Sequence, residues 1–192
     1  MTSNVWFTSD AHFGHRLVSG LRGFDSAADH DAALIETFNS LVKPKDQIWW
    51  LGDMSAGNPA PVFAAMPQIP GVHHLVTGNH DRCSPIFRDS HRWQRQFMEH
   101  FESVQAYARR RVIQEVVHLS HYPYATEDGQ ADRGEVRYAQ HRLPDLGDWL
   151  LHGHTHMADQ KVHGKQIHVG LDAWDYRPVN LDEIADIVRS AS

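Results

Sequence analysis

The 192-residue sequence is long enough to bury a substantial core, and we expect a single domain over residues 1–192. A formal net charge of −6 opposes binding to long nucleic acids or anionic membranes, and no stretch approaches the roughly 18 apolar residues of a membrane span. The single cysteine, Cys83, excludes an internal disulfide, and the first residues lack a secretory pattern, so a cytoplasmic protein is expected.

Histidine is the outlier of the composition. The 16 histidines nearly equal the 18 lysines and arginines and are scattered along the chain rather than gathered in a tag. Either many of them face solvent or several converge in space as ligands. The richest stretch is residues 151–156, LHGHTH, in which Gly153 permits a bend between histidines. This stretch alone predicts a metal site no better than a solvated loop.

The first half of the chain alternates strand and helix patterns. Short apolar runs predict three strands, at residues 5–8, 47–51 and 73–77. Helical spacing of apolar residues predicts helices at residues 27–42 and 59–66, the first with Ser26 and Asp29 as a capping box. Each strand runs into a polar cluster, namely SDAHFGH, GD and GNHD. The alternation predicts an α/β sandwich with a site along one edge of its sheets.

The second half is richer in predicted strands. Residues 103–113 and 115–119 are expected to pair across a tight turn, and the second strand leads to His121. Residues 149–151 lead into LHGHTH, and the chain ends with a strand at 165–171 and a helix at 180–190 capped by Asn180. Residues 124–147 are predicted to form a long surface loop or lid, and residues 84–100 a surface excursion containing a helix.

Five predicted strand ends carry polar side chains with metal-binding chemistry. These side chains are Asp10 and His12, Asp53, Asn79 and His80, His121, and His154 and His156. Each alone is more often a turn or surface residue, but five such placements in one small chain predict a shared site. Carboxylate, imidazole and amide ligands without thiolate suit Mn, Fe or Zn. So many ligands favour two ions about 3.5–4 Å apart with a bridging carboxylate, an arrangement that serves phosphoester hydrolysis.

The series D-x-H, G-D, G-N-H-D, a lone H and G-H-x-H, in this order over residues 10–156, resembles the calcineurin-like metallophosphoesterase superfamily. The context SDAHFGH and the ending VGLDAWDYRPVNLDEI are similar to its small bacterial and phage branch. The resemblance implies an α/β fold, a four-layer α/β/β/α sandwich of two mixed β-sheets flanked by helices. It places the site between the C-terminal ends of the two sheets.

The resemblance also implies a role for each motif residue. One divalent ion is held by Asp10, His12 and His156, the other by Asn79, His121 and His154, and Asp53 bridges the two. The ions are expected to be Mn, Fe, Zn or Ni. His80 acts on the leaving group or phosphate as a general acid or charge stabiliser, and a metal-bound hydroxide is the nucleophile. Asp81 is expected to orient the loop rather than to bind metal.

Substrate selection is expected to come from residues beside the motifs. Residues 52–57, GDMSAG, lack the second Asp and the Arg of the GDxVDRG motif of protein Ser/Thr phosphatases, which disfavours a phosphoprotein substrate. The candidates for substrate contact are Arg82, Arg177 and His15, while the roles of His15 and His152 stay open between ligand support and structure. Three aromatic residues are candidates for stacking on a base or for the core, namely Tyr122, Trp174 and Tyr176.

The favoured function is a dinuclear-metal phosphohydrolase. We expect a phosphodiesterase acting on small phosphate esters such as nucleotides or 2′,3′-cyclic nucleotides. The alternatives are a phosphomonoesterase or nuclease of the same superfamily, and a non-catalytic metal-binding interaction module. The complete motif set disfavours the last of these, and the acidic charge disfavours long nucleic acids. The sequence does not determine the oligomeric state.

Overall fold

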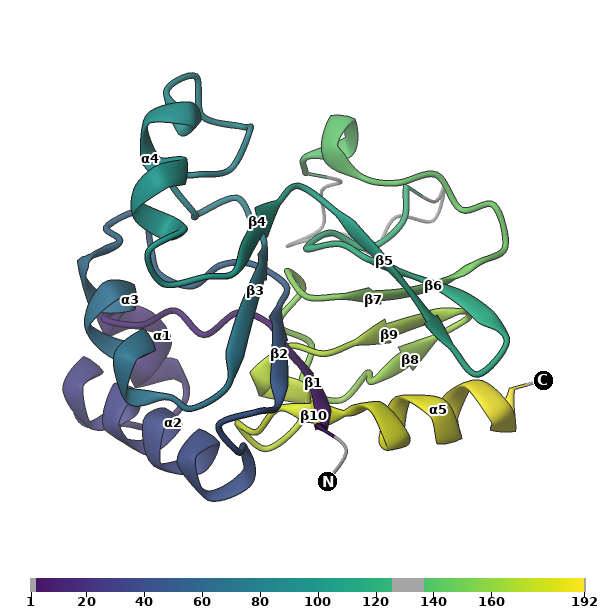
Figure 1. The fold of residues 1–192 in the computed structure, drawn as a ribbon, viewed down its shortest axis with the longest axis horizontal. Helices are drawn as coiled ribbons and strands as arrows, with labels where there is room; N and C mark the ends of the chain where they lie inside the picture. Colours follow the sequence, from purple (N-terminus) through teal and green to yellow (C-terminus); the bar gives the residue numbers. More distant parts are fainter. Residues whose placement is uncertain (1–2, 126–136, 192) are drawn as a thin grey trace.

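The computed structural model describes residues 3–125 and 137–191 and contains two β-sheets that lie side by side (Figure 1). The first sheet has five strands in the order β10-β1-β2-β3-β4. Strands β1 to β4 are parallel, and β10 joins β1 in antiparallel pairing. The strands of this sheet are β1 (Val5–Thr8), β2 (Gln47–Trp50), β3 (Val72–Val76), β4 (Ser103–Gln105) and β10 (Val179–Asn180).

The second sheet also has five strands, in the order β5-β6-β7-β9-β8. Strands β6, β7 and β9 are parallel, whereas β5 and β8 pair antiparallel at the two edges. Its strands are β5 (Ala108–Val112), β6 (Glu115–Leu119), β7 (Trp149–His152), β8 (Val162–His163) and β9 (Gln166–His168). Both sheets are therefore mixed, and in each the central strands are parallel.

Helices α1 to α4 flank the first sheet on the side away from the second sheet, whereas α5 contacts β1 and β10 of the first sheet and β5 of the second (Figure 1). The α-helices are α1 (Arg16–Leu21), α2 (Ala27–Leu41), α3 (Ala60–Ala65), α4 (Ser90–Phe97) and α5 (Leu181–Ser190). Three 3₁₀ turns complete the description, η1 (Met66–Gln68), η2 (Ala139–His141) and η3 (Leu171–Ala173). The predicted class, an α/β sandwich of two mixed sheets flanked by helices, is confirmed.

Side-chain alternation along the first sheet divides the core into two parts. Trp50 packs with helix residues such as Phe38, at 4.9 Å between ring centroids. The adjacent residue Trp49 points to the opposite face, where Phe7 meets Leu151 and other apolar side chains of the second sheet. Because both faces of the parallel strands are covered, these strands appear in the sequence as continuous apolar runs.

Local capping chemistry fixes the two longest helices where the sequence predicts them. The Ser26 hydroxyl accepts from the backbone N–H of Asp29 at 3.1 Å and begins α2. Asn180 forms a complete capping box with Glu183 at the start of α5. Each cap satisfies backbone donors that the first helical turn leaves without partners, a stabilisation of about 1 kcal/mol.

One predicted strand is wrong in its extent. Residues 103–113 form not one strand but two, because β4 joins the first sheet beside β3 and only β5 pairs with β6. The chain thus crosses between the sheets within a β-prone stretch, a change of partner that local propensity does not reveal. The predicted loop at 124–147 lies partly outside the described residues, and its described C-terminal part contains η2. The sequence did not predict α1, β8 or β10.

None of the helices within residues 3–125 and 137–191 has the length and apolar character needed to cross a membrane.

Candidate metal centre

The candidate ligands all follow the C-terminal ends of parallel strands. Asp10, Asp53 and Asn79 come just after β1, β2 and β3 of the first sheet. His121 and the 153–156 loop come just after β6 and β7 of the second sheet. Parallel strands present their C-terminal ends at one edge, and here the edges of both sheets meet. The backbone N–H of His154 donates to the Asp10 carboxylate at 3.0 Å and so joins the two edges.

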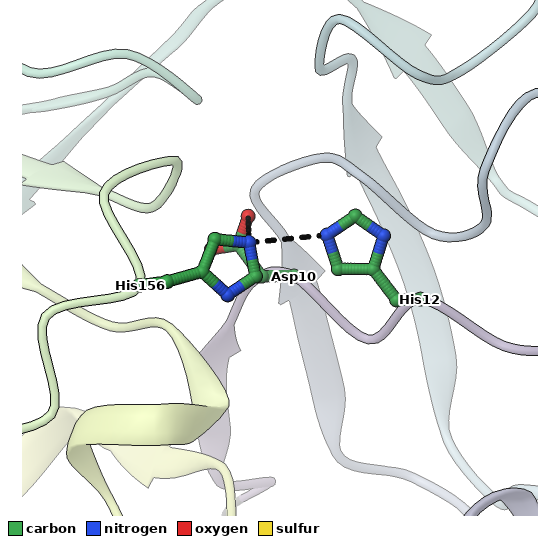
Figure 2. A group of neighbouring side chains, drawn as sticks. All are labelled: Asp10, His12 and His156. Atoms are coloured by element: carbon green, nitrogen blue, oxygen red, sulfur yellow. Dashed lines mark hydrogen bonds and ion pairs between the residues drawn. The ribbon is translucent and has the colours of Figure 1, made fainter. Parts of the chain in front are cut away.

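One cluster consists of Asp10, His12 and His156, whose potential ligand atoms lie within 4.8 Å of one another (Figure 2). The Nε2 atoms of the two histidines face each other at 3.2 Å, and their rings are stacked at 5.1 Å between centroids. The Nε2 atom of His156 also lies 3.7 Å from Asp10 Oδ1. These three residues are those that the sequence assigned to one divalent ion.

The second cluster consists of Asp53, His121 and His154, again with ligand atoms within 4.8 Å of one another. His121 Nε2 lies 3.4 Å from Asp53 Oδ2 and 3.2 Å from His154 Nδ1. Asn79 joins this cluster because its Oδ1 accepts from the same His121 nitrogen at 3.1 Å. The structure therefore brings together all seven residues predicted as ligands, in two adjacent groups.

Strained backbone is concentrated at these ligands. Five of the six clustered residues have φ between 51° and 73°, the left-handed region that side chains other than glycine rarely adopt; they are Asp10, His12, Asp53, His154 and His156. Such conformations cost roughly 1–3 kcal/mol each and persist only where the surrounding structure imposes them. Their concentration here is typical of a functional site.

Glycines allow the two sheets to approach at the carboxylates. A Cβ on Gly153 would overlap Ser9 Oγ and Asp10 Oδ2, and a Cβ on Gly78 would overlap Asp53 Oδ1. The glycines of the GNHD and GHTH motifs are thus required by close packing against two ligands.

Substitution of Gly153 by alanine is expected to destabilise the protein and disturb the first cluster. The added methyl group must displace Asp10, an overpacking that typically costs about 1–3 kcal/mol. Gly20→Ala in α1 is the matched control, because no heavy atom lies within 4 Å of its added Cβ, and alanine there should stabilise by about 0.5 kcal/mol. Urea unfolding of the metal-free variants measures both effects, and equal stability of the two variants would contradict the prediction.

Asp81 holds the two motif loops of the first sheet together. Its carboxylate accepts from the backbone N–H groups of Gly78 at 2.7 Å, Asp53 at 3.0 Å and Met54 at 2.9 Å. Asp81 is absent from both ligand clusters and orients the loops, as the sequence indicated.

The charges of the site are set by burial and by mutual contacts. Burial alone would raise the pKa of the Asp10 and Asp53 carboxyls, but the neighbouring histidines hold both below the ordinary value. Burial lowers the pKa of His12 and His154 to about 3, so both rings are neutral and offer lone pairs at neutral pH. Burial opposes the charged form of His121 as well, but Asp53 outweighs it and raises the pKa of His121 to about 9.

The residues present fit divalent transition ions. Each cluster offers one carboxylate and two imidazoles, a donor set suited to Mn, Fe, Zn or Ni, and Asn79 adds an amide oxygen. The buried Nδ1 of His12 has no hydrogen-bond partner within the described part of the chain, a costly arrangement at an already polar site. Cation binding would neutralise the two buried carboxylates and displace the proton shared around His121.

The division into two clusters makes a direct prediction. His156→Ala should weaken binding at the group containing Asp10 and His12, while His154→Ala should weaken binding at the group containing Asn79 and His121. Metal titration with one binding isotherm per variant measures the two affinities. If both substitutions depleted the same ion, the assignment of the two histidines to different ions would be wrong.

A pocket of about 630 Å³ opens directly over the clusters. His80 lines it with a side chain that is 46% exposed, and its Nε2 lies 3.9 Å from Asp53 Oδ2. His15 also lines the pocket, and its Nδ1 accepts from the backbone N–H of Val18 at the start of α1. That contact leaves the proton on Nε2, so His15 can donate a hydrogen bond into the pocket.

The structure does not bring Arg82 and Arg177 to the pocket. Arg82 pairs with Asp89 at 2.9 Å and lies over the rings of Phe87 and Trp93. Arg177 pairs with Glu183 at 2.7 Å beside α5. The arginines among the described pocket residues are instead Arg22 and Arg137. A long cationic side chain can lie next to a motif in the sequence and still point away from it. Proximity along the chain therefore predicted the pocket arginines poorly.

The remaining candidates divide between core and pocket. His152 is buried on β7, donates from Nδ1 to the carbonyl of Gly153 and belongs to neither cluster. Tyr122 and Trp174 are buried, whereas Tyr176 lines the pocket. Sequence reasoning missed Asp172, which lies 2.7 Å from His156 Nδ1. Its position in the DAWDYRP segment was the only available signal.

The geometry agrees with comparisons to known proteins. The family model of the calcineurin-like phosphoesterase superfamily domain matches residues 4–171, so the chain belongs to this superfamily. The chain is similar to the Gene 66 proteins of Mycobacterium phage L5, at 40% identity over 97% of this chain and 94% of that protein, and of phage D29, at 39% over 97% and 96%. These relatives confirm the small phage and bacterial branch that the motifs indicated.

Similarity extends to more distant proteins. The protein MJ1445 of Methanocaldococcus jannaschii is 23% identical over 96% of this chain and 90% of its own. A crystal structure of the protein AQ665 of Aquifex aeolicus superimposes with a TM-score of 0.71 at 22% identity, covering 97% of this chain and all of that one. That solved structure therefore shares the fold of this chain.

Proposed function

We propose that this protein is a dinuclear-metal phosphodiesterase acting on small phosphate esters such as nucleotides or 2′,3′-cyclic nucleotides. The observation that carries the proposal is the pair of adjacent carboxylate–histidine clusters at the base of an open pocket. When bound, two divalent ions supply Lewis acidity and lower the pKa of water.

The side chains of the pocket have separate tasks in this proposal. Asp53 belongs to the second cluster and its charge also acts on His12 of the first cluster, so Asp53 is the carboxylate that would be shared by the two ions. Its Oδ1 accepts from the backbone N–H of His80 at 2.9 Å, which fixes the carboxylate and the His80 loop together. The exposed imidazole of His80 would donate a proton to the departing oxygen. His15 is placed to donate a hydrogen bond to a phosphate oxygen or to the leaving group.

Pocket size and lining support a small ester with an apolar or aromatic part. A volume near 630 Å³ lies within the usual range for small-ligand sites, about 300–1,000 Å³. One wall is formed by α1, where Leu17 and Leu21 are 63% and 78% exposed, and Tyr138 and Tyr176 add aromatic surface. Exposed leucines that line a pocket gain free energy when a ligand covers them.

The double substitution Leu17→Ser and Leu21→Ser should raise KM for nucleoside and aryl esters with little change in kcat. Partial burial of two leucines contributes roughly 1–2 kcal/mol, or about tenfold in affinity. Leu146→Ser is the control, because Leu146 is 83% exposed and lies outside the pocket lining. An unchanged KM for the double variant would show that the α1 wall does not contact the substrate.

A turnover panel tests the function as a whole. Cyclic nucleotides, dinucleoside polyphosphates, aryl phosphodiesters and aryl phosphomonoesters are assayed with Mn, Ni and Zn, each against metal-free protein. The proposal expects metal-dependent hydrolysis with the diesters preferred. A preference for monoesters would show that the protein is a phosphomonoesterase rather than a phosphodiesterase. Metal binding without any turnover would favour the non-catalytic interaction module.

A further inference from the structure

An ion pair outside both clusters, between buried Arg22 and partly buried Asp172, connects the segments of the first cluster. Arg22 follows α1 and is 9% exposed. Its guanidinium donates twice to Asp172, from Nε to Oδ1 and from Nη2 to Oδ2, both at 2.8 Å. The same group donates to the backbone carbonyl of Asp10 at 2.8 Å and to that of Ala11 at 3.3 Å. One side chain therefore connects the loop carrying Asp10 and His12 to the η3 turn carrying Asp172.

Asp172 extends this connection to a ligand. Its Oδ2 accepts from His156 Nδ1 at 2.7 Å. A carboxylate only accepts, so the proton is on Nδ1 and the lone pair is on Nε2. Nε2 is the nitrogen that faces His12 at 3.2 Å and Asp10 at 3.7 Å. A carboxylate in this position orients a metal-binding imidazole and increases its basicity.

The third guanidinium nitrogen of Arg22 contacts His30, and the donor and acceptor of this contact can be assigned in the same way. Arg22 Nη1 lies 3.0 Å from His30 Nε2, and because a guanidinium only donates, the histidine nitrogen accepts. The proton of His30 is therefore on Nδ1, which donates to Asp31 Oδ1 at 2.9 Å. Asp31 also accepts from the backbone N–H of Gly14 at 2.8 Å, so the network returns to the loop beyond His12.

The second cluster is supported differently. The Nδ1 of His121 donates to the backbone carbonyl of Leu51 at 2.8 Å, a neutral acceptor. One histidine of each cluster is thus oriented through its Nδ1, His156 by a charged carboxylate and His121 by a peptide carbonyl. The Arg22–Asp172 pair contacts residues of the first cluster, so its effect should be confined to that cluster.

We propose that Arg22 and Asp172 are positioning residues for the Asp10, His12 and His156 cluster: Asp172 sets the tautomer of His156, and Arg22 holds the two loops of the cluster in register. The proposal rests on the proposed function to the extent that a divalent ion binds there. Its test uses metal affinity and histidine tautomers, not hydrolysis, so the two proposals fail separately.

The first measurement uses the metal-free wild-type protein. Long-range ¹H–¹⁵N spectra at alkaline pH, with His156→Gln to assign the signals, should show His156 protonated at Nδ1 alone. In Asp172→Asn the carboxylate is replaced by an amide that cannot accept from both Arg22 and His156 as before, and the His156 tautomers should become mixed. A wild-type His156 protonated at Nε2 would overturn the proposal even if the protein bound no metal.

The second measurement is calorimetric titration of the whole protein with Mn or Zn. Asp172→Asn should weaken one of the two binding steps by about 10–100-fold and leave the other unchanged, the usual size of effect for such outer carboxylates. The affected step should be the one that His156→Ala removes. Arg22→Lys, which keeps the charge but loses the two-pronged contact, should weaken the same step.

The control is Asp186→Asn, which removes an exposed carboxylate on α5 away from the pocket and should change neither step. Circular dichroism confirms that each variant is folded before titration. If Asp172→Asn and Arg22→Lys left both steps unchanged, or weakened both steps equally, the pair would be a general stabiliser of the fold and the proposal would be wrong.

Discussion

Asp53→Asn is expected to reduce metal-dependent turnover by roughly 10³-fold. The carboxylate is buried near His121, His12 and His80, and asparagine keeps its size while removing its charge and one carboxylate oxygen. A bridging ligand supports several kcal/mol of transition-state stabilisation by the two ions, and each 1.4 kcal/mol corresponds to a factor of ten. Measurement of kcat/KM at saturating metal, together with metal content by mass spectrometry, tests the prediction.

The design of this test separates catalysis from folding. The amide oxygen of asparagine still accepts from the His80 N–H, so the loop contact at 2.9 Å can persist. Asp186→Asn again serves as the matched control, since it makes the same chemical change on an exposed face. If Asp53→Asn bound both metals and kept the wild-type rate, Asp53 would have no role in catalysis.

His80→Ala is expected to reduce kcat by about 10²–10⁴-fold for esters with poor leaving groups, the usual contribution of general acid–base catalysis. The imidazole is exposed in the pocket and is absent from both ligand clusters. Metal binding should therefore change little. For a p-nitrophenyl ester, whose leaving group needs no proton, the reduction should be much smaller.

The dependence on leaving group identifies the role of His80. The control His91→Ala removes an exposed histidine of α4, which lies outside the pocket lining, and should leave kcat unchanged for every ester. An equal loss in His80→Ala across all leaving groups would assign the residue to charge stabilisation of the phosphate rather than to proton donation. No loss at all would exclude both roles.

The ligand set could be predicted from the sequence because it depends on local order. Each of Asp10, Asp53, Asn79 and His121 follows directly after an apolar run, and parallel strands place their C-terminal ends at one edge. The capped helices α2 and α5 were predictable for a similar reason, since Ser26 and Asn180 act within one helical turn. The motif glycines were visible too, although their steric reason appears only in the contact with Ser9, Asp10 and Asp53.

Other features depend on contacts between distant parts of the chain. The sequence pattern predicts residues 103–113 as one strand, and only the packing of the two sheets decides that β4 and β5 separate. Arg22 and Asp172 are 150 residues apart, so their pairing has no sequence pattern. Arg82 and Arg177 lie beside motifs but contact Asp89 and Glu183 instead of the pocket.

The sequence by itself therefore determined the family, the α/β class and the seven predicted ligand residues that the structure brings together, because strand ends and motif order are local properties. The tertiary structure alone decided which side chains line the pocket above the two clusters. It also decided that Asp172 supports His156. The partner that a long side chain reaches depends on how the two sheets pack, and no single stretch of the sequence specifies that packing.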